Sequence, residues 1–514
     1  RRWILALSAG ALATLGAFGI LLPFTQIARA ASLLLAIGIG VQMARLVLGQ
    51  PAAWFRRSRR TVMAAVVLLP LVALLQRQIL YGSIAAPRAT PSGNAPPSVL
   101  LIVLDAVRAR SVSAIRPELG TTPELARRGA QGVVFERAFS TAPWTLPSHA
   151  GMFTGLYPGE QGGDWFTPLE AGRLTLAELL RDRGYATGAF VANLHYTAWD
   201  SGLAQGFDWF EDHPADWMQV LRSSSYTQTE LFTSLLDAQS VGDVVRALRR
   251  PNLWIIPQHI YDTSLADEIG RKFLRWHDRL GGRPYFAFLN LMDGHLPFPA
   301  SPARRRRYPP LERGLADYEA AIGFMDAQIA DVLTALERAG TLDRTIVIVT
   351  ADHGELIDEH GLSGHAHNLY RNVLHVPLLV RYPDGVPAGV RVSAPGSLRY
   401  LAATVADLTG SDAAFPGSTL RRVWQGDTAA RSQAFTEVRK QPNPLGNYPA
   451  SRGNMQSLFD DSLHYIRNEG TGQEELYAYV TDTLESTNLA IGDRDGLRLR
   501  PWRDRLARLL RDRR

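Results

Sequence analysis

Long apolar stretches at the start of the chain are separated by short polar loops. Three such stretches cover residues 3–24, 28–49 and 61–80, and each is close to the length of about 20 residues that a helix needs to cross a bilayer. We therefore predict a membrane region over 1–82 with three transmembrane helices. The alternatives are a cleaved signal peptide for the first stretch and buried helices of a soluble protein for all three.

The basic loop between the second and third apolar stretches predicts on which side of the membrane the rest of the chain lies. Its arginines fall within 56–60, and basic loops stay on the cytoplasmic side. Three crossings then place the remainder outside the cytoplasm, on the periplasmic or extracellular side. Residues 83–97, rich in Pro, Ala, Ser and Gly, have the composition of a linker.

Two apolar, largely β-branched stretches of the following region end abruptly in acidic residues. Residues 98–104 lead into Asp105, and residues 345–351 lead into Asp352 and His353. Uninterrupted apolar stretches of this length are typical of buried parallel strands, and ligands gather at the carboxyl ends of such strands. We therefore predict that these three side chains lie in a functional site.

Helical periodicity over 316–339 lies just before the second of these predicted strands. Alternation of strands and helices is typical of an α/β fold with a doubly wound sheet, and we assign this catalytic domain to 98–410. Short strands and turns over 411–490 predict a smaller C-terminal subdomain. In the basic tail, 491–514, Leu and Arg alternate at roughly helical spacing, which predicts an amphipathic helix on the domain surface.

The net charge and the cysteine content limit which partners and which kinds of site the protein can have. The net charge of +6 comes from arginines beside apolar stretches and in the tail, and no nucleic-acid-binding motif accompanies them, so we expect no nucleic-acid partner. The absence of cysteine excludes disulfides, thiolate metal sites and a cysteine nucleophile. Two carboxylates and an imidazole, from Asp105, Asp352 and His353, instead suit Zn²⁺, Mn²⁺ or Mg²⁺.

The segment 140–158 carries the most specific motif of the chain, Thr145-Leu-Pro147-Ser148-His149, followed by Thr154-Gly155 and Tyr157-Pro158. It resembles the sulfatase family, which has Cys-x-Pro-Ser-Arg here with the cysteine oxidised to formylglycine. The resemblance implies an alkaline-phosphatase-like mixed sheet with a small antiparallel C-terminal subdomain. Other segments resemble the family in the same order, namely Asp105 with Arg108, 184–188, 206–208, 291–297, 352–355, 475–477 and 482–489.

Thr145 is the departure from the sulfatase motif that decides the expected chemistry. A secondary alcohol cannot be oxidised to an aldehyde, so no formylglycine is expected. Threonine here resembles the phosphoethanolamine transferases and lipoteichoic acid synthases, which are membrane proteins with an external catalytic domain. The resemblance implies that Thr145 is a nucleophile for phosphate esters of membrane lipids or envelope-linked substrates, and it implies no obligatory protein partner.

The same resemblance implies one divalent metal ion, either Mn, Mg, Zn or Ca. Its ligands would be Asp105, Thr145, Asp352 and His353. Ala106 stands where sulfatases usually carry a second aspartate, which disfavours a calcium-type site.

Several further side chains are expected near the reacting group. His295 resembles the family histidine that contacts the transferred group or protonates the leaving oxygen, and His365 and His367 lie where relatives place substrate-binding groups. Asn193 is near a lysine position of the family's substrate pocket. Alternatively, Asp293, His295 and one of His365 and His367 build a second metal site, or these histidines are satisfied within the core.

Three functions remain open on the sequence. The first is a metal-dependent hydrolase or transferase of phosphate esters that uses Thr145. The second is a sulfuric ester hydrolase that uses the unmodified threonine. The third is a catalytically inactive protein that keeps the fold for binding.

Overall fold

The computed structural model describes residues 2–21, 29–50, parts of 52–71, and 96–513 apart from 166, 213–264, 297, 299–314, 413–414, 428–433, 442–447 and 494. The chain divides into two compact units. The first consists of 1–83 with 213–262, and the second of 84–212 with 263–514.

The described part of the first unit is helical. Helices α1 (Arg2–Leu21) and α2 (Arg29–Gly49) pack against each other. They lie close together at two glycines: a Cβ added to Gly40 would lie 2.5 Å from the carbonyl oxygen of Gly10. This contact requires residues without side chains, because any larger residue would push the helix backbones apart.

The structure does not confirm three transmembrane helices. Among the described residues, no single helix is both long and apolar enough to span a membrane. Residues 33–49 and 52–60 meet these criteria only as a pair joined by a bend of 100°. The third predicted stretch, 61–80, lies largely outside the described residues.

The second unit is built on a mixed sheet of nine strands. The strand order is β10-β2-β9-β6-β1-β5-β3-β4, and β11 also pairs with β2. All pairs are parallel except those of β9 with β2 and with β6. The strands are β1 (Ser98–Leu104), β2 (Val133–Phe139), β3 (Ala186–Val191), β4 (Trp209–Glu211), β5 (Tyr285–Leu291), β6 (Thr345–Ala351), β9 (His375–Arg381), β10 (Val390–Val392) and β11 (Gly396–Ser397).

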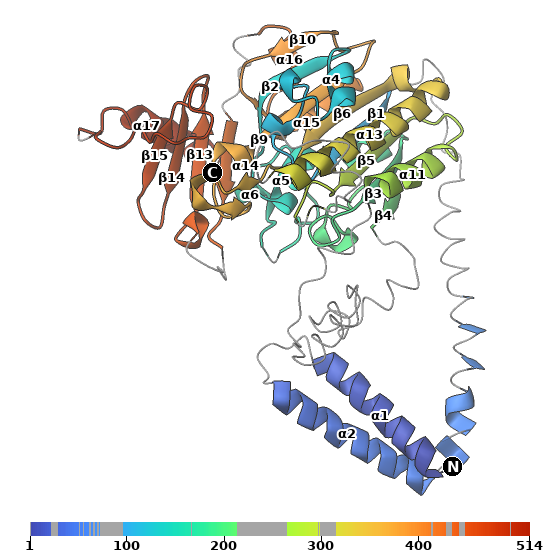
Figure 1. The fold of residues 1–514 in the computed structure, drawn as a ribbon. Coiled ribbons are helices and arrows are strands. Elements are labelled where there is room, and N and C mark those ends of the chain that lie inside the picture. Colours follow the sequence, from blue (N-terminus) through green and yellow to red (C-terminus); the bar gives the residue numbers. More distant parts are fainter. Residues whose placement is uncertain are drawn as a thin grey trace. The chain divides into compact units, whose positions relative to one another are not determined.

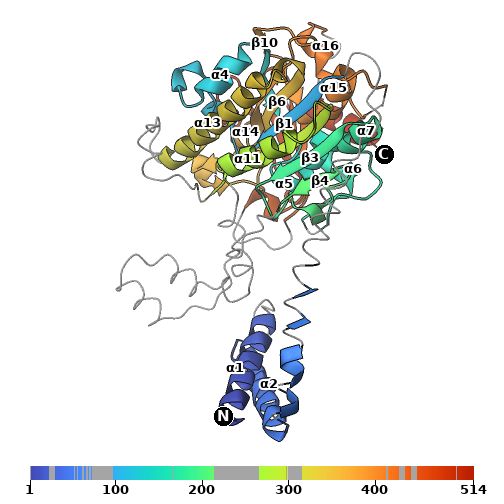
Figure 2. The same cartoon turned by 90° about the vertical axis from the view of Figure 1, so that its right-hand side faces the viewer.

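Helices cover both faces of this sheet (Figures 1 and 2). One face carries α4 (Pro123–Gly129), α11 (Ala266–His277) and α13 (Ala316–Arg338), and the other carries α5 (Thr145–Thr154), α7 (Leu176–Asp182), α15 (Leu401–Leu408) and α16 (Leu420–Trp424). Covering on both faces explains why β1 and β6 are apolar along almost their whole length. The predictions of an α/β fold, of these two strands and of the helix over 316–339 are confirmed. Short elements complete the domain, namely α6 (Pro158–Gln161), β7 (Leu356–Ile357), β8 (Ser363–Gly364) and α14 (Arg371–Leu374).

A second sheet near the C-terminus is antiparallel, with the order β12-β13-β14-β15. Its strands are β12 (Ala434–Val438), β13 (Met455–Phe459), β14 (His464–Asn468) and β15 (Glu474–Tyr477). This sheet begins well after residue 411. The helix α16 that precedes it packs on the main sheet instead, where Trp424 meets Phe135 edge to face.

The basic tail forms α17 (Arg500–Asp512) and packs on the antiparallel sheet. Trp502 and Leu506 are buried there in a cluster with Phe435 and Tyr465. Because the arginines of α17 alternate with these apolar positions, one face of the helix contributes to the core and the other stays in water.

Replacing Trp502 with alanine tests the contribution of α17. We expect Trp502→Ala to lower the free energy of unfolding by about 3–5 kcal/mol, because it removes a buried indole from this cluster. Arg508→Ala, at an exposed position of the same helix, should change it by less than about 0.5 kcal/mol. Denaturant titrations followed by circular dichroism measure both. If Trp502→Ala were as stable as the wild type, α17 would not unfold cooperatively with the rest of the domain.

Candidate active site

The predicted site residues follow the carboxyl ends of neighbouring strands. Asp105 follows β1, and Asp352 and His353 follow β6, which pairs with β1 in register. Asn193 follows β3, two strands away on the other side of β1. Parallel neighbours deliver their carboxyl ends to one edge of the sheet, so residues far apart in sequence meet there.

Thr145 is the first residue of α5, whose N-terminus lies at the same edge. Its Oγ1 is 3.3 Å from Nε2 of His353. The same Nε2 is 3.3 Å from Oδ2 of Asp352 and 3.9 Å from Oδ1 of Asp105. All four side chains are buried. The structure therefore brings together the four residues predicted as metal ligands.

Two of the carboxylate oxygens in this cluster lack a hydrogen-bond donor. Oδ1 of Asp105 and Oδ2 of Asp352 are buried without a partner, and one ligand atom from each of Asp105, Asp352 and His353 lies within 4.8 Å of the others. Burial and the charge of Asp105 raise the pKa of Asp352 well above its ordinary value. Burial, followed by the charge of His365, lowers the pKa of His353 and so favours neutral imidazole.

This arrangement fits a divalent cation. Buried charges are stable only when they are paired or coordinate a metal, and a cation would pair with both unsatisfied oxygens at once. Oxygen ligands with one imidazole match Zn²⁺, Mn²⁺ or Mg²⁺. The identity of the ion and the ligand roles stay predictions.

Asn193, which was expected in the substrate pocket, contacts the metal-site residues directly. Its Nδ2 donates to Oδ2 of Asp105 at 2.8 Å and lies 3.4 Å from Oγ1 of Thr145. The Nδ2 of Asn290 lies 3.4 Å from the same oxygen of Asp105. These amides support the second oxygen of Asp105 and leave its first oxygen free for a cation.

Asn290 and His149 are two site residues that the sequence reasoning missed. Asn290 is the only side chain in β5 with an amide group, and a buried amide inside an apolar strand is a usable signal for a site. His149 is one helical turn after Thr145, and this spacing places both on one face of α5.

His149 is held against the Thr145 backbone. Its Nδ1–H donates to the carbonyl oxygen of Thr145 at 2.8 Å, and Nδ1 is 3.6 Å from Oδ2 of Asp352. Burial lowers the pKa of His149 to about 4, so the imidazole is neutral near pH 7. His149 stands where the sulfatase motif has an arginine, so a neutral imidazole takes the place of a guanidinium in this chain.

The expected substrate-binding histidines separate into two groups. The ring of His365 lies 4.2 Å from that of His353 and 4.9 Å from that of His295, so these three form one cluster. The ring of His367 instead lies 4.0 Å from that of Tyr448, which lies between β12 and β13. Ala366, between the two histidines, has a φ of 72°, so the chain bends there and directs the two rings toward different groups.

A buried carboxylate orients His365. Both oxygens of Glu355 are 3.2 Å from Nδ1 of His365. Burial lowers the pKa of His365, but the negative charge and hydrogen bond of Glu355, together with the charge of Asp105, outweigh burial and raise this pKa above its ordinary value. The opposite ring nitrogen, Nε2, is therefore the one available to a ligand.

Gly354 allows the chain to turn sharply between the metal ligand His353 and Glu355. A Cβ at this position would lie 2.1 Å from the backbone oxygen of Asn372. Backbone atoms cannot move aside easily, so only glycine fits this close approach.

The described partners of the four predicted ligands include no cationic side chain. Among the described residues, no Lys or Arg forms a hydrogen bond or ion pair with Asp105, Thr145, Asp352 or His353. Arg108, which is buried, pairs with Glu359 instead.

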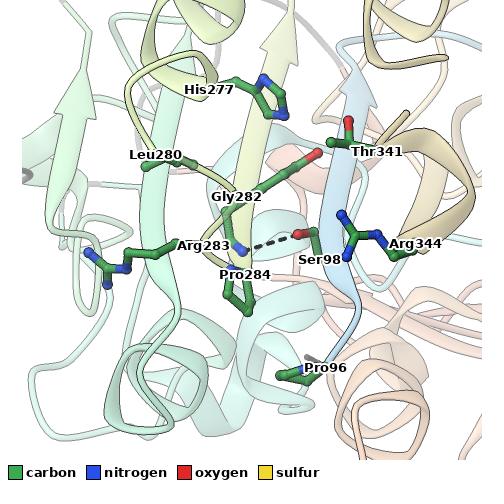
Figure 3. Close-up of a pocket in the computed structure, with 10 residues that line it drawn as sticks. Pro96, Ser98, His277, Leu280, Gly282, Arg283, Pro284, Thr341 and Arg344 are labelled. Carbon is green, nitrogen blue, oxygen red and sulfur yellow. Dashed lines mark hydrogen bonds between the residues drawn. The ribbon is translucent and has the colours of Figure 1, made fainter. Parts of the chain in front are cut away.

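A separate cavity of about 60 Å³ lies at the other end of the strands. Figure 3 shows Ser98, Arg283, Thr341 and Arg344 around it, and Oγ of Ser98 accepts the backbone N–H of Tyr285 at 3.3 Å. These residues lie at the amino ends of β1 and β5, whereas Asp105 follows the carboxyl end of β1. This cavity is not part of the candidate active site.

Comparison with known proteins identifies the family. The Sulfatase family profile matches residues 97–411. The chain belongs to the sulfatase family. Steryl-sulfatase of Mus musculus is 27% identical to this sulfatase-family protein over 457 residues, covering 71% of each chain. Arylsulfatase K of Danio rerio is 25% identical over 356 residues, covering 61% of this chain and 65% of that protein.

Solved structures show the same fold. The phosphonate monoester hydrolase of Agrobacterium radiobacter superposes with a TM-score of 0.60 at 22% identity, covering 81% of this chain and 96% of that one. The phosphonate monoester hydrolase from Silicibacter pomeroyi gives a TM-score of 0.60 at 22% identity, with coverages of 81% and 95%. The prediction of a sulfatase-family enzyme that hydrolyses sulfuric or phosphoric esters is confirmed.

Metal content tests the ligand assignment. We expect Asp105→Asn and His353→Ala each to lower the amount of divalent metal retained per chain to near zero, because each removes a group from a small cluster. Asp326→Asn is the matched control, since Asp326 is also a buried carboxylate but accepts backbone N–H groups of Glu124 and Leu125. Atomic emission on the purified proteins gives the ratio. Full metal content in His353→Ala would exclude His353 as a ligand.

Proposed function

We propose that this protein is a metal-dependent phosphate ester hydrolase or transferase with Thr145 as its nucleophile. One observation carries the proposal: Oγ1 of Thr145 lies 3.3 Å from Nε2 of His353, beside two carboxylate oxygens without hydrogen-bond donors. A hydroxyl in this position can share a cation with Asp105 and Asp352. A divalent metal bound here would lower the pKa of that hydroxyl and neutralise charge on the substrate's non-bridging oxygens.

The proposed reaction proceeds in two steps, through a covalent phosphothreonine. The Thr145 hydroxyl loses its proton to solvent, and its oxygen attacks phosphorus and forms a new P–O bond while the bond from phosphorus to the leaving oxygen breaks. The leaving oxygen takes up a proton, for which His295 and His365, whose rings lie 4.9 Å apart, are the candidates. Water or an acceptor hydroxyl then loses its proton and attacks the phosphothreonine, the bond from phosphorus to the Thr145 oxygen breaks, and that oxygen takes up a proton to regenerate the hydroxyl.

The charge of the site favours an ester with one negative charge. Asp105 and Asp352 together balance one divalent cation, and no Lys or Arg adds further positive charge among their described partners. A dianionic phosphate monoester would leave excess negative charge in a buried site, which is costly. A phosphate diester carries only one negative charge at its reacting centre.

A sulfuric ester is the second candidate, because it also carries a single negative charge. The relatives that support it are sulfatases, such as the steryl-sulfatase and the arylsulfatase K described above. Thr145 would then act as an unmodified hydroxyl, because no formylglycine can form from it.

We further propose that residues 1–82 anchor the enzyme to a membrane and that its site faces outside the cytoplasm. The apolar helices α1 and α2 and the basic loop after them support this. The substrate would then be a membrane lipid or an envelope-linked ester. Such an anchor would keep the site close to substrates that are confined to the same surface.

A substrate panel with Thr145→Ala tests the chemistry. We expect the metal-loaded protein to turn over a chromogenic phosphate diester faster than a phosphate monoester, a phosphonate ester or a sulfate ester. Thr145→Ala should lower kcat by at least about a thousandfold, because the attacking oxygen is lost. Thr154→Ala, in the same helix but with its hydroxyl bonded to the Ala150 carbonyl, should leave kcat unchanged.

Each other outcome of this panel has a definite meaning. Turnover of the sulfate ester alone would favour the second candidate. Full activity in Thr145→Ala would exclude Thr145 as the nucleophile. Mass spectrometry of the rapidly quenched reaction should show one added phosphoryl group on the peptide 145–154, and this group should be absent from Thr145→Ala.

The leaving-group dependence of a histidine variant tests general acid catalysis. We expect His295→Ala to slow esters of alkyl alcohols by about a hundredfold or more, because alkoxides need a proton to leave. Esters of 4-nitrophenol should be slowed far less, because this anion leaves without protonation. His367→Ala, whose ring contacts Tyr448, should affect both esters alike. Equal slowing of both esters by His295→Ala would rule out His295 as the general acid.

A further inference from the structure

Three aromatic side chains lie next to the nucleophile. Trp144 directly precedes Thr145, and its indole stacks on that of Trp165 with ring centroids 4.3 Å apart and planes 2° from parallel. Tyr196 meets Trp144 edge to face at 5.2 Å. Their contacts follow the geometry that aromatic pairs prefer. We refer to Trp144, Trp165 and Tyr196 as the aromatic cluster.

Hydrogen bonds fix this cluster relative to the reacting groups. Oδ1 of Asn193 accepts the backbone N–H of Tyr196 at 3.0 Å, while Nδ2 of the same amide donates to Asp105. Asn193 therefore ties the position of Tyr196 to the metal site. The Pro143 carbonyl accepts the N–H of Ala366 at 2.8 Å, which joins the Trp144 segment to the histidine loop.

A hydrogen bond from the ring nitrogen fixes the Trp165 indole. Its Nε1–H donates to the Arg439 carbonyl at 3.3 Å, and the Arg439 guanidinium pairs with Asp164 at 2.8 Å. The adjacent charges therefore cancel each other. The indole faces remain apolar beside a neutralised pair.

The three members differ in their exposure. Trp144 is only 4% exposed, whereas Trp165 and Tyr196 are half-buried. Trp144 thus supports the other two rings, and these present ring surface to solvent beside the site. Large aromatic surfaces that are rigid and partly exposed next to a reacting group are typical of binding sites for apolar parts of ligands.

We propose that the aromatic cluster is a subsite for a ring in the alcohol part of the ester. The proposal rests on the proposed function, because it names the group attached to the transferred phosphoryl or sulfuryl centre. The chemistry recognised is the flat apolar face of a ring, which stacks on indole and phenol rings. An aryl group and a sugar ring both offer such a face, whereas a small acyclic headgroup does not.

Matched substrates separate ring recognition from chemical reactivity. The test compares a 4-chlorophenyl ester with a hexafluoroisopropyl ester, whose leaving alcohols have similar acidity, and adds a hexose 6-ester as the sugar arm. For the wild type we expect kcat/KM to be higher for the aryl ester than for the acyclic one. Tyr196→Leu and Trp165→Leu should lower this preference roughly three- to tenfold each, while kcat/KM for the acyclic ester stays within about twofold.

Control variants exclude a general structural effect. Tyr196→Phe keeps the ring and should keep the preference, and Tyr382→Leu alters a half-buried tyrosine beyond the end of β9, remote from the site. If Tyr196→Leu and Trp165→Leu lose only the preference for the aryl ester over the acyclic ester, the subsite binds aryl groups. If they lose the preference for the hexose ester over the acyclic ester, the subsite binds sugars. An equal loss for ring and acyclic esters in Tyr196→Leu and Trp165→Leu would overturn the proposal.

Binding measured without turnover distinguishes the failure of this proposal from that of the proposed function. Isothermal titration calorimetry of Thr145→Ala measures its affinity for phenylphosphonate and for methylphosphonate, and it does not require turnover. Tighter binding of phenylphosphonate that Tyr196→Leu abolishes supports the subsite, even when the wild type turns over none of the esters. Equal affinity for the two ligands would overturn the subsite and leave the proposed function standing.

Discussion

The site depends on the repulsion between two buried carboxylates. The parallel pairing of β1 and β6 places Asp105 and Asp352 at the same sheet edge, and each keeps one oxygen without a donor. Burial and the charge of its neighbour raise the pKa of Asp352, in keeping with this repulsion. A divalent cation bound here would relieve the repulsion, so its binding would stabilise the folded state as well as supply the proposed reactive centre.

The surrounding residues support this pair without adding charge. Asn193 and Asn290 donate to the second oxygen of Asp105, and the helix that begins at Thr145 brings its hydroxyl next to His353. Neutral donors leave the affinity for a cation intact, whereas a lysine or arginine would compete with it. The same neutrality is the physical basis for the proposed preference for an ester that carries one negative charge.

Two groups of side chains lie near the proposed nucleophile. One consists of His295 and His365, the latter oriented by Glu355. The other is the aromatic cluster, which is tied to the metal site through Asn193. A single amide therefore connects the cation site, the nucleophile and the proposed ring subsite. Changes at Asn193 are expected to affect all three, because the amide cannot satisfy one contact without constraining the others.

The sequence by itself determined the α/β architecture, the strands that end at Asp105 and Asp352, the long helix before β6 and the family resemblance. It could do so because buried parallel strands must be apolar along their length. A carboxylate directly after such a strand can therefore be recognised in the sequence alone. It also identified Thr145 as the departure from the sulfatase motif. It did not predict Asn290 and His149, and it placed Asn193 among substrate-binding residues.

Only the tertiary structure decided which side chains meet. Asn290 lies 185 residues from Asp105 in sequence, and nothing local in the chain shows that strand β5 pairs with β1. The separation of His365 from His367, and the packing of α16 on the main sheet, likewise depend on strand order and on the path of the loops. Hydrophobic periodicity determines local structure, but contacts between distant residues are set by how the elements pair and pack, and this information is not contained in any single segment.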